Sequence, residues 1–130
     1  MKLAIRASNV RLKRAYEPHA PDDGMRILVD RLWPRGLSKD EAKLDIWLKE
    51  FAPSAGLRTW FDHDPDRWAE FRRRYRDELK QHSPLLRDLR EQARNRPITL
   101  VYSAKDETHN DAVVLRNVLL GRPNPRRRTP

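Results

Sequence analysis

Apolar residues recur along this chain at strand spacing in some segments and at helix spacing in others. Val10 and Leu12 alternate with charged residues, which predicts a half-buried strand near the start of the chain. Two compact apolar runs, 25–30 and 98–102, have strand length and many branched side chains, so they predict two central strands. Residues 17–24 carry prolines, aspartates and a glycine, and this composition predicts a surface loop.

Helical spacing dominates the segment between the two central strands. Ser38 and Glu41 have the spacing of a capping box, which marks the start of a helix. Behind this box, four apolar residues recur at the intervals of one helical face and predict a single helix: Leu44, Trp47, Leu48 and Phe51.

Further helix starts follow at serine and aspartate residues. Ser54 predicts a short helix, and the pairs Asp64-Pro65 and Ser83-Pro84 each place a capping residue before a proline at the first helical position. A last helix is predicted from about Thr108 to Gly121, a favourable residue just beyond a helix end. The apolar stripes of these helices are expected to face the core: Leu57, Trp60 and Phe61; Trp68, Phe71, Tyr75 and Leu79; Leu85, Leu86, Leu89 and Ala93; Ala112, Leu115, Val118 and Leu119.

The aromatic stripe within residues 68–79 lies beside several arginines, an arrangement that could also form a base-stacking platform. Its strict helical spacing favours a place in the core instead. The arginines within 72–76 are expected to lie on a solvated helix face, with Glu70, Asp77 and Glu78 as neighbours.

The order of strand, several helices, strand and helix predicts an α/β fold. We expect a small, mainly parallel sheet of about three to four strands, flanked by five to six helices, in a single domain over residues 1–120. Residues 121–130 are rich in arginine and proline and contain nothing apolar to bury, which predicts a separate basic, disordered tail.

Charge adds a second candidate partner to this picture. The chain has 28 Lys and Arg against 19 Asp and Glu, a net charge of +9, and a mean hydropathy of −0.93. Basic segments attract nucleic acid by neutralising phosphates, so residues 122–130 are a candidate nucleic-acid contact. No apolar run approaches the roughly 18–20 residues that cross a bilayer, and no secretory leader pattern is visible, so we expect a cytoplasmic protein without membrane contact.

Several kinds of chemistry are excluded or disfavoured. The chain has no cysteine, which excludes disulfides, a thiol nucleophile and cysteine metal sites. No glycine-rich nucleotide motif and no nucleophilic serine motif occurs. Metal-binding spacing is also missing from the four histidines: His19, His63, His82 and His109. The sequence therefore predicts neither a metal site nor a cofactor.

Ligands of open α/β sheets bind beyond the carboxyl ends of the strands, which directs attention to the residues after each central strand. After the first come Asp30, Arg31, Trp33 and Arg35. The two guanidiniums can form a fork for a phosphate or carboxylate, and Trp33 can stack on a flat group. Asp30 can orient an arginine or accept a proton. The structural alternative is an Asp30–Arg31 pair that fixes the loop, with Trp33 as a core plug.

After the second central strand, Lys105 precedes the last predicted helix, whose first amides offer a natural position for an anion. Asp106 or Thr108 could cap that helix instead. We expect His109 and Asn110 in the first helical turn, facing the same cleft. There the helix N-terminus would disfavour the imidazolium and keep His109 available as a base.

Residues 26–36 form a distinctive block, Arg-Ile-Leu-Val-Asp-Arg-Leu-Trp-Pro-Arg-Gly. Through this block the chain resembles the YeaO-like branch of the domain of unknown function 488 (DUF488) family. Shorter matches extend the resemblance from about Lys13 to Leu119: Lys13-Arg14-Ala15-Tyr16, Asp23-Gly24, Asp45 with Trp47, Ala52-Pro53-Ser54, Leu57-Arg58, Trp60-Phe61, Leu100 with Tyr102-Ser103-Ala104-Lys105, and His109-Asn110. The resemblance implies a small cytoplasmic bacterial α/β protein without a settled activity. The other branch of the family is known for cysteines, so a thiol mechanism is not carried over to this chain.

Three functional hypotheses follow. The leading one is a small-anion or nucleotide-type ligand site at the carboxyl edge of the sheet. The alternatives are a nucleic-acid-binding or transcription-regulatory module that uses the basic surface and tail, and a structural or protein-interaction domain. Under the leading hypothesis Asp30 and His109 are the candidates for proton transfer. The candidate ligand-binding residues are Arg14, Tyr16, Arg31, Trp33, Arg35, Ser103, Lys105 and Asn110.

Overall fold

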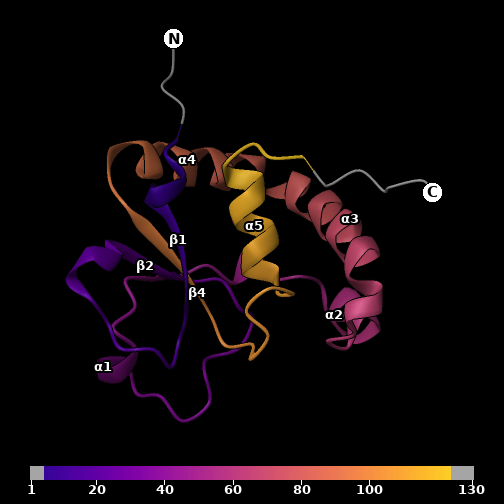
Figure 1. Cartoon of the computed structure of the whole chain (residues 1–130), viewed down its shortest axis with the longest axis horizontal. Coiled ribbons are helices and arrows are strands. Elements are labelled where there is room, and N and C mark those ends of the chain that lie inside the picture. Colours follow the sequence, from indigo (N-terminus) through magenta and orange to yellow (C-terminus); the bar gives the residue numbers. More distant parts are fainter. Residues whose placement is uncertain (1–4, 124–130) are drawn as a thin grey trace.

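Four parallel strands form the centre of the molecule (Figure 1). The computed structural model describes residues 5–123. The strands are β1 (Val10–Arg14), β2 (Met25–Leu28), β3 (Ile46–Trp47) and β4 (Ile98–Tyr102). Their order is β1-β4-β2-β3, and every pair is parallel. All carboxyl ends therefore meet at one edge of the sheet.

The helices are α1 (Lys39–Ala42), α2 (Ala55–Phe61), α3 (Trp68–Leu79), α4 (Ser83–Asn95) and α5 (Asp111–Leu119). In Figure 1, α5 lies beside β1 and β4 with α3 beyond it, and α4 lies across the end of the molecule where β1 begins. The predicted α/β class, parallel sheet and strand number are confirmed. Because α1 is a single turn, the described residues contain four longer helices, slightly fewer than the five to six predicted. No described helix has both the length and the hydrophobicity needed to cross a membrane.

The two faces of the sheet are covered differently. Alternate residues of β2 and β4, such as Ile27 and Leu100, enter the main core with the apolar stripes of α2–α5. Leu28 and Val101 face the other way and pack against a smaller cluster contributed by the loop that follows β2. The predicted aromatic stripe on α3 is core, because its central residue Tyr75 is fully buried.

The helix predicted over residues 38–51 is wrong beyond its first turn. The capping box is present, since Ser38 Oγ accepts from the Glu41 amide at 3.1 Å and Glu41 Oε1 accepts from the Ser38 amide at 3.0 Å. Lys43 then adopts the left-handed conformation (φ 48°) and ends α1. The following residues pair with the free edge of β2 as β3, where the amides of Asp45 and Leu48 donate to the carbonyls of Arg26 and Leu28, both at 2.9 Å.

Candidate functional site

A cavity of about 690 Å³ opens at the carboxyl edge of the sheet. The loops after β2 and β4 form two of its walls, and residues from the end of α2 form a third. Of the ten site residues predicted from the sequence, Arg14 does not line this cavity. The other nine do: Asp30, His109, Tyr16, Arg31, Trp33, Arg35, Ser103, Lys105 and Asn110. The structure thus brings together two loops that are more than 70 residues apart in the chain.

The basic side chains that line this cavity are exposed to solvent. There are four of them: Arg31, Arg35, Arg58 and Lys105. Arg31 is held loosely by one hydrogen bond of 3.3 Å from its Nη2 to the Pro53 carbonyl. These side chains keep most of their donors available, and guanidinium donors suit phosphate or carboxylate oxygens.

The carboxyl groups of this cavity lie further inside. Asp30 and Asp111 are both half-buried, and their side chains lie within hydrogen-bonding reach of each other. Asp30 Oδ2 also accepts from the Ser103 amide at 2.8 Å. The Asp30–Arg31 ion pair considered from the sequence is absent among residues 5–123, because Asp30 instead ties the two loops together.

Burial raises the pKa of both carboxyls. For Asp30 the hydrogen bonds from Ser103 and the charge of Arg58 oppose this effect without cancelling it. For Asp111 the negative charge of Asp30 adds to burial and raises the pKa well above its usual value. The pair therefore retains a proton to higher pH than ordinary aspartates do.

A second polar pair lies in the loop before α5. Asp106 Oδ1 accepts from the amides of Thr108 and His109, and its Oδ2 lies 2.9 Å from His109 Nδ1. The two amide hydrogen bonds are the main reason that the pKa of Asp106 lies well below its ordinary value. With Nδ1 engaged by Asp106, Nε2 is the ring nitrogen left for a ligand.

The predicted start of the last helix is corrected here. Asn110 is the cap residue, since its side-chain oxygen accepts from the Val113 amide at 3.0 Å, and α5 begins at Asp111. Asp106 and Thr108 form a turn ahead of the helix and do not cap it. His109 and Asn110 consequently precede the first turn. His109 rests edge-on against Trp68, with ring centroids 5.2 Å apart.

Three more of the predicted ligand residues also have structural contacts. Arg14 donates to the carbonyls of Ala104 and Ser103, at 2.9 and 3.3 Å, and so fastens the loop after β4 to β1. Tyr16 donates to the Arg35 carbonyl at 2.9 Å. Trp33 donates from Nε1 to the Leu37 carbonyl at 2.7 Å and packs in the smaller core cluster. Trp33 thus combines the core role considered from the sequence with a place in the cavity wall.

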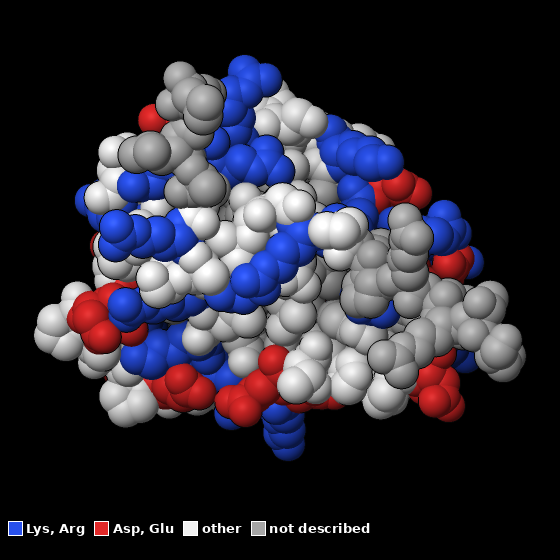
Figure 2. Space-filling model, turned by 45° about the horizontal axis from the view of Figure 1, so that its top comes forward, with Lys and Arg blue, Asp and Glu red and all other residues white. Residues whose placement is uncertain are grey.

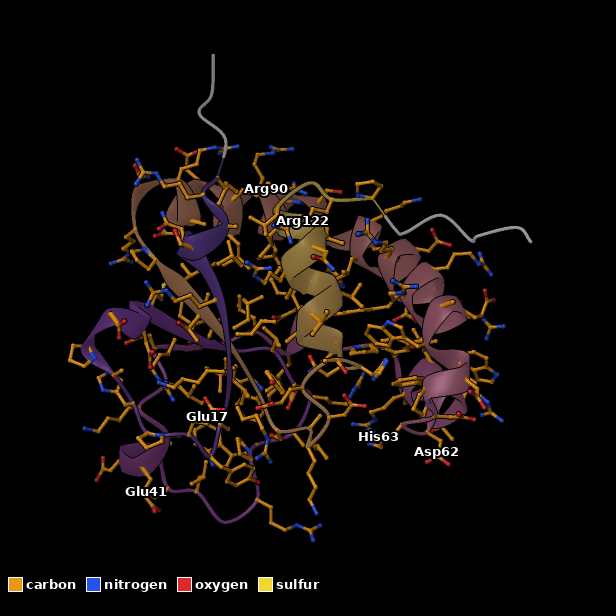
Figure 3. The ribbon with its side chains drawn as sticks, in the orientation of Figure 1. Glu17, Glu41, Asp62, His63, Arg90 and Arg122 are labelled. Carbon is orange, nitrogen blue, oxygen red and sulfur yellow. The ribbon has the colours of Figure 1, made fainter. Side chains whose placement is uncertain are left out.

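Sequence reasoning missed Asp111, Arg58 and His63 as members of this site. His63, labelled in Figure 3, follows Asp62 at the end of α2, and both adopt left-handed backbone conformations (φ 53° and 47°). Two successive non-glycine residues in this region are unusual and indicate local strain. For His63, the sequence shows only a histidine between two aspartates after a short predicted helix. This pattern is equally typical of the start of the next helix.

The fold and the cavity together define a small α/β protein with a charged pocket at the carboxyl edge of a parallel sheet. The chain belongs to the DUF488 family: the family model described as "Inactive DUF488-N3 subclade" matches residues 9–128. It is similar to the uncharacterized protein YeaO of Escherichia coli, with 48% identity over 82% of this chain and 93% of that protein. It is also similar to the uncharacterized protein Rv3073c of Mycobacterium tuberculosis, with 42% identity over 91% of this chain and 99% of that protein. No solved structure matches the chain.

Proposed function

We propose that the protein binds a small anionic or nucleotide-type ligand in the cavity at the carboxyl edge of the sheet. The observation that carries this proposal is the convergence of Arg31, Arg35, Arg58 and Lys105 on one cavity of about 690 Å³. This volume lies within the roughly 300–1,000 Å³ range of small-molecule sites. Several exposed cations around one concave site favour a ligand with a phosphate or carboxylate group.

The inner part of the cavity suits a different end of the same ligand. Asp30 and Asp111 offer carboxyl oxygens that accept hydrogen bonds, which favours hydroxyl or amino groups on the ligand. Trp33 and Tyr16 border the cavity and provide flat surfaces against which a ring can lie. A ligand with an anionic group at one end and a hydroxyl- or amine-bearing group at the other would use both parts.

Binding without turnover is the form of this proposal that we favour. The matching family model is described as inactive, and this description is the reason for the preference. If the protein does carry out a reaction, Asp30 and His109 remain the candidates for proton transfer, since each presents an acceptor atom to the cavity.

A thermal-shift screen of the purified full chain tests the proposal. The panel contains inorganic phosphate, pentose phosphates, nucleoside monophosphates and dicarboxylates. A ligand at about 100 times its Kd stabilises the folded state by roughly 2.7 kcal/mol, which raises Tm by several degrees. The strongest compound is then titrated by calorimetry against the unmodified protein and two variants.

Lys105→Ala removes a lysine of the pocket, and Lys39→Ala removes an exposed lysine on α1 as the control with matched charge. We expect Lys105→Ala to weaken binding roughly 10-fold or more, the scale of a hydrogen bond to a charged group, while Lys39→Ala leaves it unchanged. Equal effects of the two variants, or a panel in which no compound raises Tm, would contradict the proposal. The second of these results would favour a structural or protein-interaction domain.

A further inference from the structure

Arginine side chains gather at the end of the molecule opposite the cavity. Figure 2 looks toward this end and shows Lys and Arg across its surface, with Asp and Glu mainly toward its periphery. Figure 3 places Arg90 and Arg122 together beside the carboxyl end of α5, and far from His63 of the cavity. The cluster described below is therefore separate from the proposed ligand site.

Five arginines from three helices and the segment after α5 form this α5-end cluster: Arg72, Arg76, Arg90, Arg116 and Arg122. Arg76 donates from Nη2 to the Arg122 carbonyl, and Arg90 donates to the carbonyls of Val118 and Leu119 at 3.0 and 3.3 Å. Arg116 donates from Nη2 to the Ala7 carbonyl at 3.0 Å. The Arg72 guanidinium lies over the Trp68 ring, with its carbon 5.6 Å from the ring centroid, and the Arg122 side chain has no described hydrogen bond. The described partners of the five are thus backbone carbonyls and an aromatic ring, none of which carries a formal charge.

Within residues 5–123 none of these five guanidiniums forms an ion pair with a carboxylate. Neighbouring arginines differ in this respect, because Arg73 and Arg74 both bind Glu70, at 2.7 and 2.8 Å. The prediction of a solvated face balanced by acidic neighbours therefore holds for Arg73 and Arg74. For Arg72 and Arg76 it is wrong, and the buried Nε atoms of both have no hydrogen-bond partner among the described residues.

The structural explanation for such a cluster is that arginines compensate the negative end of a helix dipole. The end of one helix carries only about half an elementary charge, and one guanidinium suffices to satisfy its last carbonyls. Arg90 already does this for α5. The four other guanidiniums are not needed for this purpose. Arg76 and Arg116 donate to carbonyls outside α5, and Arg72 and Arg122 have no described side-chain hydrogen bond. The proximity of these arginines has an electrostatic cost, since burial and then the charge of Arg72 lower the pKa of Arg76, and burial and then Arg122 lower that of Arg116.

A cluster of positive charges without carboxylate partners is suited to binding a polyanion from outside the molecule. Guanidiniums bind phosphate oxygens with two parallel hydrogen bonds, and several of them on one face match the repeated phosphates of a nucleic-acid backbone. The sequence beyond Pro123 contains three more arginines, Arg126, Arg127 and Arg128, which lie outside the described residues. The exposed large apolar side chains among the described residues, Tyr16, Leu32 and Ile46, are not part of this cluster, so a lipid surface would gain no apolar insertion beside it.

We propose that the α5-end cluster binds the phosphate backbone of nucleic acid, independently of the ligand cavity. The contacts involve phosphates alone, so binding is insensitive to base sequence and weakens steeply with salt. If all five guanidiniums contact phosphates of a duplex, the logarithm of affinity falls with the logarithm of salt concentration with a slope of about −4.5, at about −0.9 for each phosphate.

The test uses fluorescence anisotropy of a labelled duplex and the full chain between low and physiological salt. Arg72→Gln/Arg122→Gln removes two charges without a described carboxylate partner, and Arg73→Gln/Arg74→Gln removes two charges that form ion pairs with Glu70, Arg73 also with Asp77. Both variants have the same net charge. We expect the first variant to lose about 10-fold or more in affinity and to reduce the salt slope by about two. The second should lose less than about threefold with an unchanged slope.

Two further measurements complete the test. Arg122→Gln alone alters an exposed side chain with no described side-chain hydrogen bond, so it keeps the test valid if the double variant unfolds, and it should reduce the slope by about one. Deletion of residues 124–130 should leave measurable binding. Equal losses in the two double variants, complete loss on this deletion, or binding to phosphatidylserine vesicles and not to the duplex would each overturn the proposal.

Discussion

The carboxylate of Asp30 accepts a 2.8 Å hydrogen bond from the backbone amide of Ser103. This bond joins the loop after β2 to the loop after β4, so one side chain both lines the cavity and sets the distance between two of its walls. The role of Asp30 in binding can therefore be separated from its role in folding by choosing substitutions that keep or remove the acceptor atom.

We predict that Asp30→Asn folds with nearly unchanged stability, because an amide oxygen can still accept from Ser103. Asp30→Ala leaves that amide without its acceptor in a half-buried position and should cost roughly 1–3 kcal/mol. Urea unfolding measures both values. If Asp30→Asn is as destabilised as Asp30→Ala, the charge itself holds the loops together, and a direct role in ligand binding loses its support.

We predict that Asp111→Asn stabilises the protein at neutral pH, by about 0.5–2 kcal/mol, as substitutions that relieve a strained functional site commonly do. Folding raises the pKa of Asp111 through burial and the charge of Asp30. The folded state therefore binds more protons than the unfolded state above the ordinary value of 3.8, and stability falls as the pH rises through this interval. Tm measured from pH 4 to 8 should fall less steeply in Asp111→Asn than in the unmodified protein. A parallel decline in both would show that folding does not raise the pKa of Asp111.

We predict that Arg35 and Lys105 share one anionic group of the ligand found in the screen. Each alanine variant should lose roughly 1.5–3 kcal/mol of binding energy, and the double variant should lose clearly less than the combined losses because both contacts serve one partner. Both side chains are exposed, so neither variant should change the free energy of unfolding appreciably. Strict additivity in the calorimetric cycle would place the two residues on separate ligand groups.

The strands that could be predicted from the sequence are those whose apolar pattern is local and long enough. β1, β2 and β4 each carry four or five residues with a recognisable pattern. β3 has only the two residues Ile46 and Trp47, and Trp47 also fits the helical face predicted for residues 44–51. Their strand pairing depends on the free edge of β2, which is a tertiary property that no short window of sequence contains.

In the candidate site too, the parts with a local sequence pattern could be predicted and the parts that depend on tertiary packing could not. The two loops could be predicted because each directly follows an apolar strand. Arg58 and His63 could not, since they reach the cavity only through the packing of α2 on α3, where Phe61 and Phe71 stack with centroids 4.3 Å apart. Asp111 was missed because several residues before α5 are good caps, and only the structure decides which one begins the helix.

We predict that Asp23→Asn strongly destabilises the protein. Arg26 is buried in the sheet and donates to Asp23 at 2.7 Å. Burial alone would raise the pKa of Asp23, but the Ala20 amide and the side chains of Lys13 and Arg26 lower it below its usual value. This stabilisation is present above pH 3.8 and is lost as the pH falls through the lowered pKa.

Removing one partner of a buried ion pair costs roughly 3–5 kcal/mol, and this is the loss expected for Asp23→Asn in urea unfolding at pH 7. The control is Asp22→Asn, since Asp22 pairs with Arg11 on the surface, where their side chains are 76% and 37% exposed. An exposed pair is worth less than about 1 kcal/mol. Similar losses in the two variants would mean that the buried pair is not a main determinant of stability.

Gly24, in the loop before β2, lies close against the backbone of Pro97. We predict that Gly24→Ala destabilises the protein more than Gly36→Ala or Gly56→Ala. Gly24 has φ +66°, and a Cβ atom there would lie 2.1 Å from the Pro97 carbonyl oxygen, which belongs to the backbone entering β4. The clash cannot be relieved by rotating a side chain, so the two central strands must separate at their start. Overpacking of this kind costs roughly 1–3 kcal/mol. The positive φ combined with a ψ of −138° lies outside the left-handed helical region and adds a backbone cost of roughly 1–3 kcal/mol for a residue with a Cβ.

The two matched variants separate these contributions. Gly36→Ala also places alanine at a positive φ (+83°), but with open space around it, so it should lose only about 1 kcal/mol. Gly56→Ala lies in α2 with no contact and no positive φ, and it should gain roughly 0.4–1 kcal/mol. Chemical denaturation of the three proteins should therefore rank them with Gly56→Ala most stable and Gly24→Ala least stable. If Gly24→Ala loses no more than Gly36→Ala, the start of β4 moves aside freely, and the close approach to Pro97 does not restrict position 24.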